Sequence, residues 1–221
     1  MHADTPLTTN DRQKELPTLP EGFVYLDQIC PTIMQNLKYA SDDNFTGTIV
    51  RGYNKNTAIL TSKAAKALQQ VQEELEIKNQ TLLIWDAYRP TMAVDYFLEW
   101  EHQPDNPRIK EKFYPHLTKE ELFTIGFIAP GHSTHSRGST IDLTIFDKES
   151  SQELNMGTDF DFFDKKTYTN NQNISQEAQK NRKYFVNLMD KYGFENYHKE
   201  WWHFTLRNEP FPNTYFNFPV G

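Results

Sequence analysis

The chain has 221 residues, with 23 basic and 30 acidic side chains and a net charge of -7. That balance, with no stretch rich in lysine and arginine, disfavours nucleic acid or another polyanion as a partner. The hydrophobic fraction of 37% predicts a folded core, and the chain has no run of roughly 20 apolar residues that could span a bilayer.

The single cysteine and the N-terminal residues indicate further what kind of protein this is. Cys30 is the only cysteine, which excludes an internal disulfide and a thiolate-rich zinc site. Residues 1–20 are polar and lack the apolar stretch of a signal peptide, so we interpret them as a flexible segment before one domain at residues 21–221. We expect a soluble protein, cytoplasmic as the chain stands and periplasmic if a signal peptide was removed.

The region before residue 60 predicts little regular structure. Residues 22–29 alternate loosely and predict a strand or a turn that Pro31 ends. Residues 39–47 are polar and predict a loop, and residues 48–53 predict a short strand.

A helix and a buried strand are predicted next. Thr61 or Ser62 is suited to cap the helix, whose apolar residues follow spacings of 4, 3 and 4 at Ala64, Leu68, Val71 and Leu75. Residues 81–85, Thr-Leu-Leu-Ile-Trp, form a short apolar run that is typical of a strand buried on both faces.

Two further helices are predicted between residues 90 and 126. Pro90 begins one that extends to about Glu101. Thr118 and Glu121 form a capping-box pair for the other, which should end near Gly126.

The last part of the chain alternates between loops, strands and one helix. Residues 128–136 predict a loop, residues 140–146 a strand and residues 159–173 an irregular segment. Ser175 caps a helix that Gly193 closes, and residues 201–206 predict the final strand before a proline-rich coil. These elements predict an α+β fold, a single domain with helices packed on a mostly antiparallel central sheet.

Two segments carry side chains that could bind a metal ion or transfer a proton. Residues 133–142 read Ser-Thr-His-Ser-Arg-Gly-Ser-Thr-Ile-Asp, and residues 200–203 read Glu-Trp-Trp-His. Together they offer two imidazoles and two carboxylates. A catalytic zinc ion takes three such ligands and leaves one position for water, while a nearby carboxylate outside the ligand set serves as the base.

The spacing within the second segment predicts a local irregularity. In an extended strand, Glu200 and His203 would point to opposite faces. We therefore expect a turn or bulge at Trp201 and Trp202 that brings both side chains to one metal. Asp142 begins an alternating apolar run and should lie at the mouth of a strand.

These motifs resemble a known family. Ser-x-His-x-x-Gly-x-x-x-Asp, then Glu-x-x-His, with Asp-Ala-Tyr-Arg-Pro at residues 86–90, closely resembles the VanX-type D-alanyl-D-alanine dipeptidases, zinc peptidases that share a fold with the Hedgehog signalling domain. The likeness extends from about residue 23 to residue 220. It includes residues 39–47, 156–161 and 210–219.

The resemblance implies a role for each of these side chains. One zinc ion per chain would be held by His135, Asp142 and His203, and Glu200 would act as the general base. Arg89 would stabilise the oxyanion of the tetrahedral intermediate. The implied reaction is hydrolysis of the free dipeptide D-Ala-D-Ala to two D-alanines.

The resemblance also implies residues that bind the substrate. Asp161 matches the carboxylate that the family uses for the substrate amine, and Ser133 matches a hydroxyl near the substrate carboxylate. Tyr39 and Tyr53 match tyrosines of the pocket. Because both ends of the dipeptide would be recognised, longer peptides should fail as substrates.

Simpler interpretations stand beside these roles. Asp142 has a possible ion-pair partner in Arg137, and Arg89 has one in Asp86. His132 and His198 lie near the motifs, but the family pattern uses neither, so we expect His132 beside the site or in solvent and His198 in a structural place. Trp201 and Trp202 are expected in the core or the pocket wall.

Two other functions remain as alternatives. A D,D- or L,D-carboxypeptidase that acts on peptidoglycan stem peptides shares the same set of His, Asp and Glu residues. A non-catalytic zinc-binding module is also consistent with the fold relationship, although such a site needs neither Glu200 nor Arg89. Vancomycin resistance, cell-wall turnover and use of D-alanine as a nutrient all require the same reaction, and the sequence indicates no oligomeric state.

Overall fold

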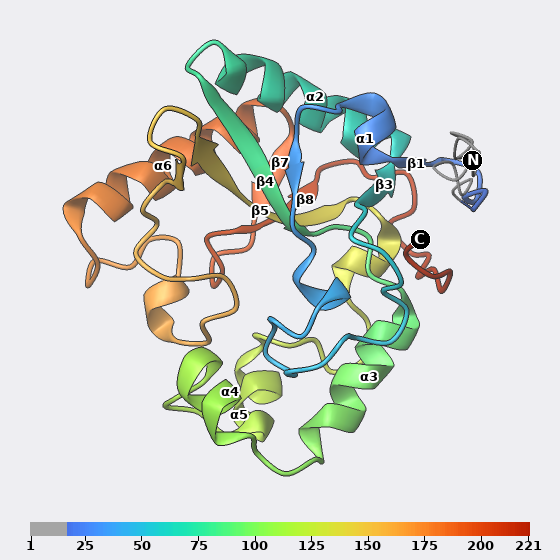
Figure 1. Ribbon diagram of the computed structural model, residues 1–221, viewed down its shortest axis with the longest axis vertical. Helices are drawn as coiled ribbons and strands as arrows, with labels where there is room; N and C mark the ends of the chain where they lie inside the picture. Colours follow the sequence, from blue (N-terminus) through green and yellow to red (C-terminus); the bar gives the residue numbers. More distant parts are fainter. Residues whose placement is uncertain (1–16) are drawn as a thin grey trace, which may run out of the picture.

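The computed structural model describes residues 17–221, and a six-stranded sheet runs through its centre (Figure 1). The strand order is β2–β4–β5–β8–β7, with β6 paired to β5, and only the β2–β4 pair is parallel. A second sheet pairs β1 with β3. The strands are β1 (Phe23–Tyr25), β2 (Met34–Gln35), β3 (Ile59–Thr61), β4 (Gln80–Asp86), β5 (Thr140–Asp147), β6 (Gln152–Glu153), β7 (Phe194–Asn196) and β8 (His203–Leu206).

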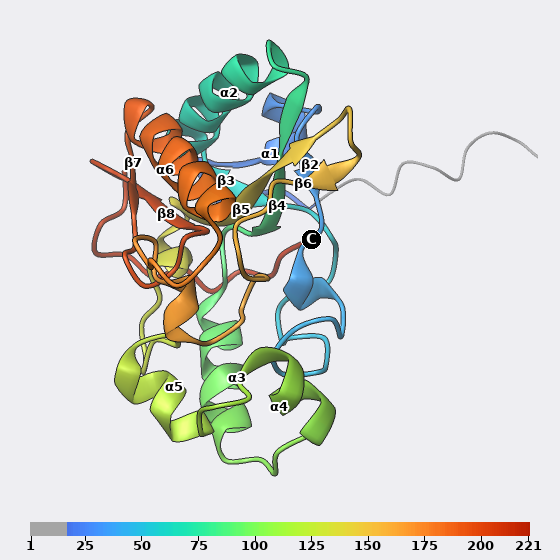
Figure 2. The ribbon, with the colours of Figure 1, turned by 90° about the vertical axis from the view of Figure 1, so that its left-hand side faces the viewer.

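The helices form two groups. Figure 2 shows α2 and α6 on the same side of the central sheet, whereas α3, α4 and α5 lie together at the far end of the molecule. The α-helices are α1 (Leu26–Ile29), α2 (Ser62–Glu76), α3 (Thr91–Glu101), α4 (Pro107–Phe113), α5 (Lys119–Ile125) and α6 (Gln176–Lys191). Short 3₁₀ turns are η1 (Lys38–Ala40), η2 (Thr134–Arg137) and η3 (Lys165–Thr167). The predicted α+β fold with a mostly antiparallel sheet is therefore confirmed.

Local capping explains why the helices begin where the sequence predicts. The Thr61 hydroxyl accepts a hydrogen bond from the Ala64 amide at the start of α2, and Ser175 does the same for Ala178 in α6. Both hydrogen bonds of the capping box predicted for α5 are present. Gly126, with φ of 87°, ends that helix in the left-handed conformation.

Two predictions for local structure need correction, and one helix was missed. Residues 48–53 form no strand, because turns follow one another there and only Tyr53 makes an isolated bridge to Val220. Residues 22–29 divide into β1 and α1. Helix α4 was not predicted, although Asn106 caps it and Pro107 occupies its first turn, which together are a recognisable start signal.

The predicted flexible segment at residues 1–20 lies largely outside the described residues, so the proposed domain boundary stays a prediction. Among residues 17–221, no helix combines the length and the apolar character that crossing a membrane requires.

Candidate metal centre and active site

The site is built on a row of residues across three antiparallel strands. Asp86 of β4 lies opposite Asp142 of β5, and Asp142 lies opposite His203 of β8. Directly opposite residues in antiparallel strands project to the same face of the sheet, about 5 Å apart. The sheet register therefore brings together side chains that are far apart in sequence.

A bulge in β4 makes this register possible. Pairing between β4 and β5 runs regularly as far as Ile84 and Leu143, then shifts so that Asp86 pairs with Asp142. Trp85 is the extra residue. Without the shift, side-chain alternation would place Asp86 out of line with Asp142.

The 3₁₀ turn η2, which precedes β5 in the chain, supplies His135. The Ser133 hydroxyl accepts a hydrogen bond from the His135 amide at 3.3 Å, and Gly138 ends the turn with φ of 81°. The His135 ring is buried, and its Nδ1 lies 2.7 Å from the Ala87 carbonyl oxygen. Because Nδ1–H donates to this carbonyl, the lone pair of Nε2 points into the site.

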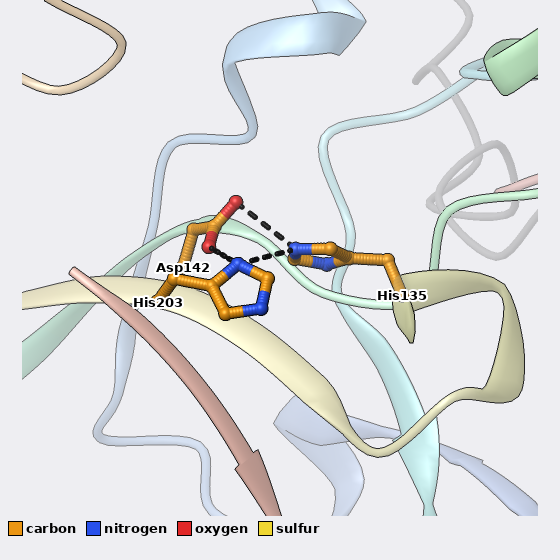
Figure 3. A group of neighbouring side chains, drawn as sticks. All are labelled: His135, Asp142 and His203. Carbon is orange, nitrogen blue, oxygen red and sulfur yellow. Dashed lines mark hydrogen bonds and ion pairs between the residues drawn. The ribbon is translucent and has the colours of Figure 1, made fainter. Parts of the chain in front are cut away.

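Three ligand atoms converge on one point, as Figure 3 shows. His135 Nε2 lies 3.2 Å from Asp142 Oδ2, and His203 Nδ1 lies 3.1 Å from Asp142 Oδ1. The two imidazole nitrogens are 3.3 Å apart. All three groups offer an atom within 4.8 Å of the others, which is the arrangement of a three-ligand metal site.

The chemistry of this donor set fits a metal ion. Asp142 Oδ1 is buried and accepts no hydrogen bond from any side chain within residues 17–221. A buried carboxylate oxygen without a partner is costly unless a cation satisfies it. The His135 contact with a backbone carbonyl is also the usual way in which a ligand imidazole is oriented.

The charge states of these groups suit coordination. Burial opposes ionisation of Asp142, but His135 and His203 outweigh it and lower its pKa below the ordinary value. Burial lowers the pKa of His203, although the nearby Asp142 carboxylate opposes this shift. Both groups are therefore deprotonated at neutral pH, as metal ligands must be.

Glu200 reaches the same point through the expected turn. Trp201 and Trp202 form a turn before β8, and the His203 amide donates to the Glu200 carbonyl at 3.3 Å. The prediction of a turn here is confirmed. Glu200 Oε2 lies 3.5 Å from His203 Nδ1. Burial raises the pKa of Glu200 well above its ordinary value, and the carboxylates of Asp142 and Asp161 raise it further.

Arg89 lies beside Asp142 and is anchored by Asp86. Its Nε and Nη2 donate to Asp86 Oδ2 at 2.9 and 2.8 Å, and Nη2 lies 3.5 Å from Asp142 Oδ2. Tyr53 donates to the other Asp86 oxygen at 2.5 Å. The sequence alternative that Arg89 pairs with Asp86 is thus correct, but the same guanidinium also faces the site.

A cavity of about 310 Å³ opens over these groups. Its lining includes His135, Asp142, His203, Arg89 and Glu200. Four phenylalanines from four separate segments also line the cavity. The local sequence carries no signal for them, because they are ordinary core residues: Phe45, Phe97, Phe127 and Phe163.

Two of the four residues that the resemblance assigns to the substrate line this cavity. Asp161 and Ser133 are both lining residues, whereas Tyr39 and Tyr53 are not. The Tyr39 hydroxyl instead donates to Asp161 at 2.8 Å. Burial raises the pKa of Asp161 to about 8, with a further contribution from Asp142.

The remaining candidates lie elsewhere. Arg137 forms its ion pair with Glu209, which is against the alternative of pairing with Asp142. His132 is exposed at the cavity rim and stacks on Tyr215. His198 does not line the cavity.

Comparison with known proteins places the chain in a family. The family model described as D-Ala-D-Ala dipeptidase matches residues 20–221. A D-alanyl-D-alanine dipeptidase of Enterococcus faecalis is 42% identical, covering 92% of this chain and 100% of the relative. Dipeptidases of Streptomyces coelicolor and Escherichia coli are 39% and 32% identical, covering 90% and 83% of this chain and 98% and 84% of the relatives. The chain therefore belongs to the D-Ala-D-Ala dipeptidase family, and it is a metallopeptidase.

Proposed function

We propose that this enzyme hydrolyses the free dipeptide D-Ala-D-Ala with one zinc ion, held by His135, Asp142 and His203. The observation that carries the proposal is the convergence of these three side chains, with Glu200 beside them and Arg89 facing them in one cavity. A zinc ion with three protein ligands lowers the pKa of a bound water to about 7 and polarises a carbonyl oxygen.

Glu200 is proposed as the proton carrier. Its carboxylate takes a proton from the attacking water and then delivers it to the leaving amine. The buried setting supports this role, because it raises the pKa of Glu200 and so makes the carboxylate a stronger base than an exposed glutamate. Glu200 Oε2 lies 3.5 Å from His203 Nδ1, close to where the proposed metal would be held.

Arg89 is proposed to stabilise the negative charge that develops on the carbonyl oxygen. Its fixed position supports this role, because two hydrogen bonds to Asp86 prevent the guanidinium from reorganising during the reaction. Asp86 is itself held by Tyr53, so we propose that Tyr53 acts through this carboxylate.

The ends of the dipeptide need partners of opposite charge. We propose Asp161 as the acceptor for the substrate ammonium group and Ser133 as a donor near the substrate carboxylate. Both line the cavity, and Tyr39 holds Asp161 in place. An acylated amine has no positive charge and could not pair with Asp161.

Substitution of Glu200 tests the mechanism. Glu200→Gln keeps the shape of the side chain but cannot accept the proton, so we expect bound zinc at one ion per chain with a loss of about 100- to 10,000-fold in kcat. His135→Ala is the matched control and should lose the metal itself. A Glu200→Gln protein with full zinc and the parental rate would refute the assignment of the base.

Substrate length separates the dipeptidase from a carboxypeptidase. Turnover of D-Ala-D-Ala is compared with that of N-acetyl-D-Ala-D-Ala on the same preparation. We expect acetylation to abolish turnover. Equal or faster turnover of the acetylated peptide would instead support a carboxypeptidase that acts on stem peptides.

A further inference from the structure

A buried arginine that lies outside the cavity has contacts that bear on how the substrate is bound. Arg182 lies on α6 with a relative exposure of 1%. No carboxylate in the described part of the chain forms an ion pair with it, and burial lowers its pKa to about 10, so it keeps its charge at neutral pH. A buried cation without an acidic partner is costly, and an apolar side chain of similar size would ordinarily be more stable.

The guanidinium is used to join two stretches of backbone. Its Nε donates to the Met156 carbonyl at 2.7 Å, and its Nη1 donates to the carbonyls of Lys166 and Tyr168 at 2.8 and 2.9 Å. These acceptors lie in the irregular segment between β6 and α6 (Figure 1). Arg182 therefore joins the two ends of this loop, with Nε bonded to one end and Nη1 bonded to the other.

Asp161 lies midway along this loop. It has φ of 55°, the left-handed conformation that residues other than glycine seldom adopt. Such a backbone conformation persists only where the surroundings enforce it. Tyr39 fixes the carboxylate itself, but the two ends of the loop are joined by Arg182.

The same segment also contacts the residues that flank Glu200. The Trp201 amide donates to the Thr167 carbonyl at 3.1 Å, and the Thr167 hydroxyl donates to the Lys199 carbonyl at 2.8 Å. The Trp201 indole donates to Thr158 at 2.8 Å, and Arg182 lies over the Trp201 ring. The loop is thus hydrogen-bonded to the residues on either side of Glu200.

We propose that Arg182 is a positioning residue that holds Asp161 where the substrate ammonium group is bound. The planar guanidinium holds its donors in fixed, different directions, so that Nε and Nη1 reach carbonyls at the two ends of the loop. This inference rests on the proposed function, because it assumes that Asp161 accepts the ammonium group.

The first test measures kcat and KM for D-Ala-D-Ala in Arg182→Met and Arg182→Lys, at matched zinc content. Met removes all the donors, and Lys keeps the charge but loses the planar fork. We expect kcat/KM to fall about 10- to 100-fold in both variants, mainly through KM, because a displacement of about 1 Å at a binding group has an effect of this size. Parental kcat/KM in a folded Arg182→Met enzyme would overturn the inference.

A double-mutant cycle with Asp161→Asn distinguishes positioning from general stability. If Arg182 acts through Asp161, Arg182→Met should lower kcat/KM about two-fold or less in the Asp161→Asn background. Equal fold losses in both backgrounds would overturn the inference. If Arg182→Met does not fold, the same cycle with Arg182→Lys decides.

Lys119 provides a matched control. It is also a buried cation, and its Nζ donates to the carbonyls of Trp100 and Gln103 at 2.9 and 2.8 Å, near the end of α3. Lys119→Met should lower the Tm but keep kcat/KM within about two-fold of the parent. An equal loss of kcat/KM at Lys119 and Arg182 would overturn the inference.

The outcomes also separate this inference from the proposed function. An Asp161→Asn enzyme with parental kcat/KM refutes the ammonium role of Asp161, and the inference falls with it. An impaired Asp161→Asn enzyme whose loss adds in full to that of Arg182→Met refutes the inference alone.

Discussion

The side chains around the cavity carry more negative than positive charge. Asp86, Asp142, Asp161 and Glu200 are all buried, and Arg89 is the cationic side chain that contacts this group. If all four carboxylates are ionised, a divalent metal ion and one substrate ammonium group would balance the excess. The raised pKa values of Asp86, Asp161 and Glu200 have the same origin, since burial comes first and neighbouring carboxylates add to it.

Asp161 gives the first prediction at this scale. Its pKa of about 8 in the metal-free fold exceeds the ordinary value of 3.8, so the folded state keeps a proton that the unfolded state loses. The stabilisation that this bound proton gives to the folded state is complete below about pH 4, and it disappears as the pH rises to about 8. Across this window the slope is about 1.4 kcal/mol per pH unit, or about 3–6 °C in Tm per pH unit for a chain of this size.

Asp161→Asn is neutral at every pH and should lack this dependence. We expect the Tm of the metal-free parent protein to fall more steeply between pH 5 and pH 8 than that of the variant, as measured by calorimetry. Parallel curves for the two proteins would show that Asp161 is ionised at neutral pH.

At the scale of elements, the position of His135 depends on how η2 ends. The Gly138 amide donates to the His135 carbonyl at 3.0 Å, and the Gly138 carbonyl accepts from the Thr61 amide at 2.7 Å. A Cβ atom added at Gly138 would collide with the ring of Phe23. One small residue therefore connects the turn that carries His135, the start of α2 and the aromatic ring of Phe23 in β1.

Gly138→Ala should destabilise both the fold and the site. The left-handed φ costs about 1–2 kcal/mol in any residue with a Cβ, and the collision adds about 1–3 kcal/mol. Gly193→Ala is the control, because its φ is 91° but its Cβ would lie 3.6 Å from Leu206, an ordinary contact. We expect zinc affinity to fall only in Gly138→Ala, as measured by competition with a chelator. Equal affinities in the two variants would contradict the role of η2.

At the scale of the whole molecule, the metal is expected to join distant parts of the chain. The proposed ligands come from η2, β5 and β8, and the proton carrier comes from the turn before β8. A ligand that binds only the folded state stabilises it by about 2.7 kcal/mol at a free concentration of 100 times Kd. Zinc should therefore stabilise the entire fold.

Zinc is expected to raise the Tm by about 5–10 °C at that concentration, because 1 kcal/mol corresponds to about 2–4 °C here. Its binding should release protons at neutral pH, since a cation lowers the raised pKa values of the nearby carboxyls. Calorimetric titration in buffers with different ionisation enthalpies measures this release. His135→Ala should show neither effect, and proton uptake by the parent protein would contradict the proposed arrangement.

The sequence by itself determined the local features and the chemistry available. Caps at Thr61 and Ser175 and the spacing of apolar residues predicted α2 and α6, because these signals act within one or two turns of the chain. The spacing of three residues between Glu200 and His203, which would put them on opposite faces of a strand, predicted the turn before β8. The motifs identified the family, which the comparisons confirm.

Only the tertiary structure decided how these parts meet. The bulge at Trp85 sets the register that aligns Asp86 with Asp142, and nothing in the local pattern indicates it. The phenylalanines that line the cavity and the contacts of Arg182 bring together segments that are distant in sequence. Such contacts depend on the packing of the whole chain, which residue types and spacings do not specify.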